Sequence, residues 1–178
     1  MFPIALDLTK INIALVGNGE ALKRRHEQLL EYGVSNISLL RGDEIDAAIQ
    51  TGLFHFIRND EKIVMVAGLD YERSKKIADA ARAAGKLVNV EDMNDLCDFY
   101  FTANVKRGDL VIAVSTGGAS PTLARRIRDY IAEKFTKDWE ERVVEIADYR
   151  KNLKDSGKTT PQVLKASDDF LREKGWLK

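Results

Sequence analysis

The chain has 178 residues, and its 28 Lys and Arg residues balance 28 Asp and Glu residues, so its formal net charge is zero. This length suffices for one domain, with or without a small appendage, and for a core that needs no disulfides. With 44% hydrophobic and 31% charged residues the chain is not disordered, and its neutrality excludes nucleic-acid binding through bulk positive charge. We therefore expect a globular protein without a nucleic-acid partner.

The number of cysteines and the length of the apolar runs indicate the cellular compartment in which the protein is expected. Cys97 is the only cysteine and cannot form an internal disulfide, and no Cys or His cluster has zinc spacing. We expect a reducing, cytoplasmic location and no fixed metal site. The longest apolar runs, at 63–67 and 110–114, are far shorter than the roughly 20 residues of a membrane span, and residues 1–7 lack the pattern of a secretory signal. No membrane partner is expected.

Short β-branched runs alternate with helical patterns over the first hundred residues. This alternation predicts an α/β fold with a parallel sheet. Strands are predicted at residues 11–16, 36–40, 54–57, 62–67 and 87–90. A helix is predicted to follow Gly19 and to end at Tyr32, with Gly33 in the C-cap place. Further helices are predicted at 43–49 and 71–84.

After Asp98 the pattern changes. Strands are predicted at 99–105 and 110–114, joined by a tight turn, and Ser120 and Pro121 have the residue types that begin a helix. From residue 135 the chain is predicted to be helical. One apolar stripe contains Trp139, Val143, Ile146 and Leu153, and a last helix begins at Thr160. We predict a nucleotide-binding domain at 1–98, a smaller α/β region at 99–134 and a helical region at 135–178.

A glycine turn lies between the first strand and the first helix. Gly17, Asn18 and Gly19 form the arrangement in which a pyrophosphate approaches a helix N-terminus, so we expect a Rossmann-like sheet with a dinucleotide here. Leu22 occupies the place of the third small residue of that motif. A tight strand-to-helix turn without a nucleotide is the alternative.

Arg41 follows the second predicted strand, where an acidic residue that binds the adenosine ribose is expected. Asp43 and Glu44 come just beyond it. Arg41 is suited to a 2′-phosphate, which would indicate NADP, or to stacking on adenine. An ordinary solvated turn residue is an equal alternative.

A second glycine-rich loop precedes the helix that begins at Pro121. Its backbone N–H groups, with basic residues one and two turns along the helix, suit a phosphate or a ligand with several carboxylates. The residues concerned are Ser115, Thr116, Gly117, Gly118, Arg125 and Arg126. The alternative is a simple loop followed by a basic, solvated helix face.

An acidic run follows the predicted strand at 87–90, at the sheet edge where open α/β sheets bind ligands. Asp92 is placed to accept a proton or to contact a metal transiently, and a solvated acidic turn is the alternative. Residues 91–98 contain four acids and no base. Cys97 is interpreted as a packing residue, and His26 and His55 as structural or surface residues.

Five stretches together resemble a known family. They are FPIALDL at 2–8, VGNGE at 16–20, VNVED at 88–92, LCDF at 96–99 and, most specifically, RGDLVIAVSTGGASPTLAR at 107–125. These stretches resemble the precorrin-2 dehydrogenase and sirohydrochlorin ferrochelatase family, the NAD-dependent part of siroheme synthase. The resemblance covers residues 1 to about 134 of this sequence.

The resemblance implies an enzyme that oxidises the tetrapyrrole precorrin-2 to sirohydrochlorin with NAD, NADP not being excluded. Bifunctional members also insert Fe²⁺, and whether this chain does so stays open. The implied catalytic residue is Asp92. The implied cofactor residues are Gly17, Asn18, Gly19, Glu20 and Arg41, and the implied substrate residues are Ser115, Thr116, Gly117, Gly118, Arg125 and Arg126. Family members are homodimers in which the C-terminal part helps to build the partner's site.

The sequence departs from the family mostly near the cofactor. Leu22 replaces a small residue, AGLD at 67–70 replaces the usual Ala-Thr-Asp-Asp, and Thr102 replaces a proline. The region between Arg41 and Lys62 is also shorter than usual. Two other functions therefore stay open: a chelatase or tetrapyrrole-binding protein with a degenerate cofactor pocket, and a nucleotide-sensing Rossmann module.

Overall fold

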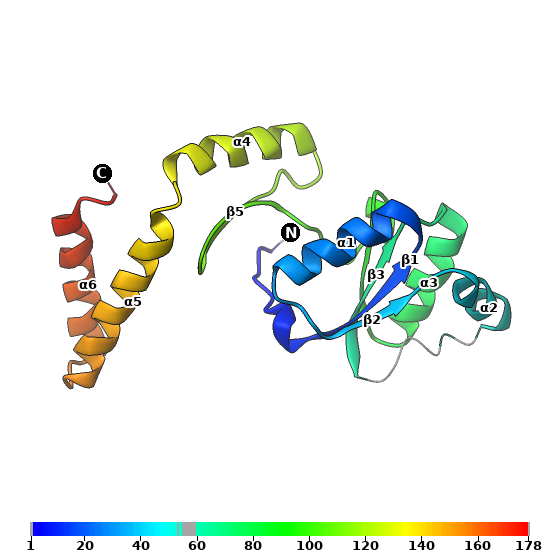
Figure 1. The fold of residues 1–178 in the computed structure, drawn as a ribbon, viewed down its shortest axis with the longest axis horizontal. Coiled ribbons are helices and arrows are strands. Elements are labelled where there is room, and N and C mark those ends of the chain that lie inside the picture. The colour runs from blue at the N-terminus through cyan, green and yellow to red at the C-terminus, as the bar shows by residue number, and fades with distance from the viewer. Residues whose placement is uncertain (1, 53, 55–59, 178) are drawn as a thin grey trace. The chain divides into compact units, whose positions relative to one another are not determined.

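The computed structural model describes residues 2–52, 54 and 60–177, which form two compact units (Figure 1). The N-terminal unit is Met1–Phe101 and the C-terminal unit is Thr102–Lys178. The predicted division into regions at 1–98, 99–134 and 135–178 stays a prediction. No helix in the described ranges is long and apolar enough to cross a membrane.

The N-terminal unit is a four-stranded parallel sheet with helices on both faces, which confirms the predicted α/β, Rossmann-like fold. The strand order is β2-β1-β3-β4. Along the chain these elements are β1 (Asn12–Gly17), α1 (Gly19–Glu31), β2 (Ile37–Leu40), α2 (Asp43–Thr51), β3 (Glu61–Ala67), α3 (Tyr71–Ala83) and β4 (Leu87–Val90). Single 3₁₀ turns lie at Leu8–Lys10 and Asn94–Leu96. Since the chain leaves β1 toward β2 and then crosses to β3 on its other side, the carboxyl end of β1 is the switch point at which such sheets bind ligands.

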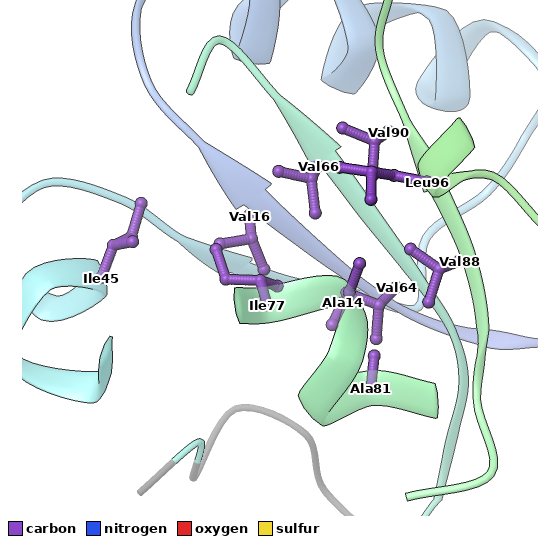
Figure 2. Close-up of a cluster of buried hydrophobic side chains, with 11 residues drawn as sticks. Ala14, Val16, Ile45, Val64, Val66, Ile77, Ala81, Val88, Val90 and Leu96 are labelled. Atoms are coloured by element: carbon purple, nitrogen blue, oxygen red, sulfur yellow. The ribbon is translucent and has the colours of Figure 1, made fainter. Parts of the chain in front are cut away.

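Strand β1 is buried on both faces because helices cover both sides of the sheet. Ile13 and Leu15 pack with Leu22 and Leu29 of α1 in one cluster. Ala14 and Val16 belong to the opposite cluster, where Figure 2 shows them beside Ile77 and Ala81 of α3 and Ile45 of α2. Leu22, the departure from the glycine motif, is thus a core residue that anchors α1 to the sheet.

Two predicted strands need comment. The strand at 54–57 falls almost wholly outside the described residues, and Phe54, which is described, is not in a strand. The strand predicted at 99–105 is wrong over 99–102, because β5 spans Ala103–Arg107. The backbone at Phe99 is engaged elsewhere: its carbonyl accepts a hydrogen bond from the Asn89 side chain at 2.9 Å, and its ring packs on the cluster of α1 and β1.

The C-terminal unit begins with an antiparallel hairpin of β5 and β6 (Leu110–Val114), closed by a turn at Gly108 and Asp109. It continues with α4 (Pro121–Lys134), α5 (Trp139–Asp155) and α6 (Thr160–Lys174). The Ser120 hydroxyl caps α4 by accepting from the Leu123 N–H at 3.2 Å, as predicted. Arg107 donates to the Phe135 carbonyl at 2.7 Å, which ties the hairpin to the end of α4.

Helices α5 and α6 are joined by aromatic contacts. Trp139 lies against Phe135, with ring centroids 4.9 Å apart, and against Trp176 at 6.4 Å. Tyr149 stacks on Phe170 at 4.4 Å. All four residues of the predicted stripe on α5 are half-buried, so this stripe takes part in packing within its own unit.

Candidate functional site

The glycine turn at the end of β1 is fixed by close contact with the end of β3. A Cβ on Gly17 would lie 1.8 Å from the Ala67 carbonyl oxygen, and the Asn18 N–H donates to that oxygen at 3.1 Å. Gly17 is therefore required for packing of backbone on backbone. Gly19, with φ of +65° and open space where a Cβ would be, begins α1 and leaves its N-terminus accessible.

Asn18 connects this turn to the tip of β2. Its side-chain oxygen accepts a hydrogen bond from the Gly42 N–H at 2.9 Å. Gly42 has φ of +67°, a conformation that favours glycine. The loop carrying Arg41 is thereby held beside the glycine turn, although the two are 23 residues apart in sequence.

A pocket of about 510 Å³ lies between these two loops. Three predicted cofactor residues line it, namely Asn18, Gly19 and Arg41. Five further residues line it that sequence reasoning did not assign to the site: Leu22, Lys23, His26, Leu39 and Gly42. Lys23 and His26 follow Gly19 by four and seven residues, which is the spacing of one helix face and the signal that would have found them. Gly17 and Glu20 are not among the lining residues.

Gly68 is a further residue that sequence reasoning did not assign to the site, and it packs against the glycine turn from the end of β3. It has φ of +70°, and a Cβ on it would lie 2.2 Å from the Asn18 carbonyl oxygen. This position lies within AGLD, where the family usually has Ala-Thr-Asp-Asp. The absence of a Cβ at Gly68 leaves room for the Asn18 carbonyl oxygen.

These features fit a dinucleotide. An accessible helix N-terminus and a glycine without steric neighbours suit a pyrophosphate, and the adjoining pocket carries basic side chains that suit further phosphate. The pocket lies at the switch point of the sheet, where general rules place the ligand.

Asp92 lies just beyond β4 at the same edge of the sheet. It is exposed and has φ of +59°, and it is the one non-glycine residue with positive φ in the described part of the chain. The N–H of Glu91, the residue before Asp92, donates to the Val66 carbonyl at 2.9 Å. This hydrogen bond fixes the backbone as far as Glu91. A non-glycine residue kept in this region costs free energy, and such residues are concentrated at functional sites.

Three of the four acids of residues 91–98 have partners outside this loop, and two of these three are paired with arginines. Glu91 forms an ion pair with Arg24 at 2.9 Å, and Asp95 accepts from the Tyr71 hydroxyl at 2.8 Å. Asp98 accepts from Arg82 at 2.9 Å and from the Val88 N–H at 2.8 Å. Among the described residues, Asp92 is the one acid of the four that forms neither a hydrogen bond nor an ion pair.

Helix α1 holds this loop through two arginines. The Arg25 guanidinium lies 3.8 Å from Glu91 and 4.1 Å from the centre of the Phe101 ring, and its side chain is only 13% exposed. Burial lowers the pKa of Arg25, and Glu91 opposes that effect. The hydrogen bond to Glu91 raises the pKa of the exposed Arg24, and the Asp92 charge adds weakly. The helix that begins at the glycine turn therefore also positions the Asp92 loop.

Cys97 closes the loop. Its sulfur accepts from the Val90 N–H at 3.2 Å, and its single S–H has two carbonyl acceptors within reach, those of Val90 at 3.1 Å and Met93 at 3.3 Å. Burial raises the pKa of this thiol, which disfavours the reactive thiolate. The environment agrees with the interpretation of Cys97 as a packing residue.

The second glycine loop, in the C-terminal unit, is tied by Thr116 and Ser120. The Thr116 hydroxyl accepts from the Ser120 N–H and donates to its carbonyl, both at 3.1 Å. The Gly117 N–H donates to the Ser115 hydroxyl at 3.2 Å. The N–H groups of Gly117, Ala119 and Ser120 are thus used within the loop, whereas that of Gly118, which has φ of +87°, has no acceptor among the described residues. The charge available to an anion here comes from the exposed Arg125 and Arg126.

Metal ligands do not gather at either place. Within residues 2–52, 54 and 60–177, no three side chains of His, Cys, Asp or Glu lie close enough together to hold a metal ion.

A glycine turn, an accessible helix N-terminus and a basic pocket at the switch point of a parallel sheet define the NAD(P)-binding class of Rossmann-like proteins. Residues 4–103, more than half of the chain, match the family described as putative NAD(P)-binding, and residues 107–134 match the central segment of sirohaem biosynthesis proteins. The chain belongs to this putative NAD(P)-binding family, and its relatives are siroheme synthases.

Two of these relatives illustrate the similarity. The siroheme synthase of Methylococcus capsulatus is 35% identical over 139 residues, which are 72% of this chain and 29% of that protein. The siroheme synthase of Nitrosomonas eutropha is 33% identical over 138 residues, 71% of this chain and 29% of that protein. The chain thus spans less than a third of the length of these relatives, and the resemblance seen in the sequence is confirmed.

A solved structure shares the fold. The precorrin-2 dehydrogenase SirC superposes with a TM-score of 0.73 at 20% sequence identity, covering 96% of this chain and 89% of that one. The likeness extends over both units of the chain.

The contact between Gly68 and Asn18 predicts that Gly68→Ala is much more destabilising than Gly85→Ala. Both glycines have φ near +70°, but a Cβ on Gly85 meets nothing within 4 Å. The control should lose only the conformational cost, about 1–2 kcal/mol. Gly68→Ala should lose roughly 3–4 kcal/mol, because the clash is with backbone. Urea unfolding followed by circular dichroism measures the unfolding free energy of both variants. Equal losses of unfolding free energy would show that the backbone contact between Gly68 and Asn18 is not rigid.

The different burial of the two arginines of α1 predicts that their substitutions differ in their effect on stability. Arg25→Ala should lower the free energy of unfolding by roughly 1–3 kcal/mol, because a mostly buried guanidinium loses its ring contact and its carboxylate. Arg24→Ala should change stability little, since its side chain is 67% exposed. Both tryptophans lie in the C-terminal unit, so their fluorescence reports separately whether that unit is unaffected. A larger loss of unfolding free energy for Arg24→Ala than for Arg25→Ala would contradict the role given to Arg25.

Proposed function

We propose that this chain is a nicotinamide-dinucleotide-dependent precorrin-2 dehydrogenase that forms sirohydrochlorin. The observation that carries the proposal is Asp92: an exposed carboxylate without a partner among the described residues, held with positive φ at the ligand-binding edge of a dinucleotide-type sheet. The precorrin-2 dehydrogenase that shares the fold and the siroheme synthases that share the sequence support the substrate class.

Each residue of the N-terminal unit that the proposal uses has a separate role. Gly19 and the N-terminus of α1 bind the pyrophosphate, and Asn18 keeps the β2 loop beside it. When bound, the nicotinamide ring supplies the hydride acceptor, NAD being expected from the resemblance. Oxidation of the macrocycle removes a hydride and a proton, and the Asp92 carboxylate takes the proton or passes it to solvent.

The second glycine loop binds the periphery of the substrate. Precorrin-2 carries several carboxylates, which suit the guanidinium groups of Arg125 and Arg126 and the free N–H of Gly118. Thr116 and Ser120 fix the loop so that little ordering is needed on binding. Ser115 and Gly117 shape the same turn.

Substitution of Asp92 is expected to separate activity from stability. Asp92→Asn and Asp92→Gly should lower turnover about 100-fold or more, because the proton acceptor is lost. Asp92→Gly should be no less stable than the parent chain, because glycine relieves the cost of positive φ, about 1 kcal/mol. Turnover is followed by dinucleotide reduction and the sirohydrochlorin spectrum, and stability by urea unfolding.

Asp95→Asn is the control for this experiment, since its side chain still accepts a hydrogen bond from Tyr71. It should keep turnover within about twofold of the parent, well short of the loss expected for a general base. Normal turnover by Asp92→Asn would refute the role of Asp92. Absence of turnover by the parent chain with either dinucleotide would refute the dehydrogenase itself. Added Fe²⁺ in the same assay tests iron insertion, for which Asp92 would accept pyrrole protons.

We also propose a homodimer, with α4 as part of its interface. Leu123, Ile127 and Tyr130 lie on one face of α4 at spacings of four and three residues and are 49%, 38% and 62% exposed. Such a stripe on a helix is unusual unless another surface covers it. A second copy of the chain fits because the sequence resemblance is to homodimeric enzymes.

Light scattering after size exclusion tests this proposal. The parent chain should elute at twice its monomer mass, and Ile127→Asp should shift it to the monomer because a charge enters the apolar stripe. Leu164→Asp, at an equally exposed leucine on α6, should leave the dimer intact. A monomeric parent chain, or a dimer that survives Ile127→Asp but not Leu164→Asp, would be contrary to the proposal.

A further inference from the structure

Asp92 occupies a turn that its own backbone holds only weakly. It is the third residue of the turn from Val90 to Met93, and with positive φ this place favours glycine. The hydrogen bond that closes the turn, from the Met93 N–H to the Val90 carbonyl, is long at 3.4 Å. A residue in such a conformation keeps it only where the surrounding structure holds the backbone in place. The residues that follow the turn therefore matter for Asp92.

Helix α3 contacts the loop directly after this turn. Tyr71, the first residue of α3, donates its hydroxyl hydrogen to the Asp95 carboxylate at 2.8 Å. We infer that Tyr71 is a positioning residue for Asp92, acting through Asp95. The inference rests on the proposed role of Asp92 as proton acceptor, and it adds a residue outside the predicted site.

The position of Tyr71 is itself fixed. Asp70 caps α3 by accepting from the Arg73 N–H at 2.9 Å, and Arg73 forms an ion pair with Asp46 of α2. Tyr71 follows Gly68 by three residues, and Gly68 packs against the glycine turn. The Tyr71 hydroxyl is thus presented from the same closely packed edge of the sheet as the glycine turn.

The stretch from Asp92 to Asp95 lies between two anchored residues. Glu91 is paired with Arg24, while Leu96 is buried and its carbonyl accepts from Arg82 at 2.8 Å. Asp95, in contrast, is exposed, and Tyr71 fixes its side chain. Loss of the Tyr71 hydroxyl should therefore loosen this stretch without disturbing the fold on either side.

A second tyrosine contacts the same stretch through a longer hydrogen bond. The Tyr100 hydroxyl donates to the Asn94 carbonyl at 3.2 Å. The bond from Tyr71 is shorter and has an ionised acceptor, and such bonds are stronger than those between neutral groups. The hydrogen bond to Asp95 also raises the pKa of Tyr71, so the phenol keeps the proton that it donates. Of the two tyrosines, Tyr71 is the one that should control the position of Asp92.

Tyr71→Phe tests the inference, because it removes the hydroxyl and keeps the ring. It should lower kcat about 5- to 10-fold and leave KM and the dinucleotide Kd within about twofold, since a misplaced proton acceptor affects the chemical step. Asp95→Ala should give the same loss, whereas Asp95→Asn, which still accepts from Tyr71, should not. Tyr149→Phe, whose ring stacks on Phe170, is the control for removal of a phenol hydroxyl and should change none of these constants.

Two further measurements separate positioning from a general structural effect. In the Asp92→Asn background, Tyr71→Phe should cause no further loss of kcat, because it acts through the carboxylate that is already absent. Hydrogen exchange followed by NMR should be about fivefold faster in Tyr71→Phe at the amides bonded within the loop, and unchanged in α1. These amides belong to Met93, Leu96 and Cys97.

Unchanged exchange or an unchanged kcat in Tyr71→Phe would overturn the inference. A further loss of kcat in the Asp92→Asn background would also overturn it, since Tyr71 would then act independently of Asp92. Absence of turnover by the parent chain would refute the proposed function instead. The exchange measurement, which needs no turnover, would then decide whether Tyr71 holds the loop.

Discussion

The site depends on the close packing of two backbone segments, one at the end of β1 and one at the end of β3. The peptide at Asn18 lies between Gly17 and Gly68, and a side chain at either position would collide with backbone oxygen. Its N–H is bonded to Ala67, and its side chain holds Gly42. Because interiors have the density of organic crystals, this contact leaves α1 a single starting point and direction.

Because its start is fixed, helix α1 places its side chains at defined positions around the pocket and against the Glu91 loop. Leu22 anchors the helix to the sheet, Lys23 and His26 face the pocket, and Arg24 and Arg25 bind the Glu91 loop. The pocket beside the glycine turn and the Asp92 loop are thereby positioned by one rigid element rather than by two independent loops. Catalytic groups need this precision, because small displacements from the productive geometry cost large factors in rate.

Charge has different roles in the two units. In the N-terminal unit most acids near the site are paired, and the free charges are Asp92 and the basic side chains around the pocket. In the C-terminal unit the second glycine loop is held by its own hydroxyls, and its free charges are Arg125 and Arg126. A chain with zero net charge is thus compatible with two sites for anionic ligands.

The sequence by itself determined the α/β class, most element bounds, the end of α1 before Gly33, the Ser120 cap of α4, and the position of Asp92 just after β4. Hydrophobic periodicity, glycine placement and capping are local properties, and they can be read along the chain. Only the tertiary structure decided which acids are paired, that Asp92 has positive φ, that Gly68 supports Asn18, and that β5 begins at Ala103. These features depend on contacts between residues far apart in sequence, and a single sequence carries no record of which distant residues meet.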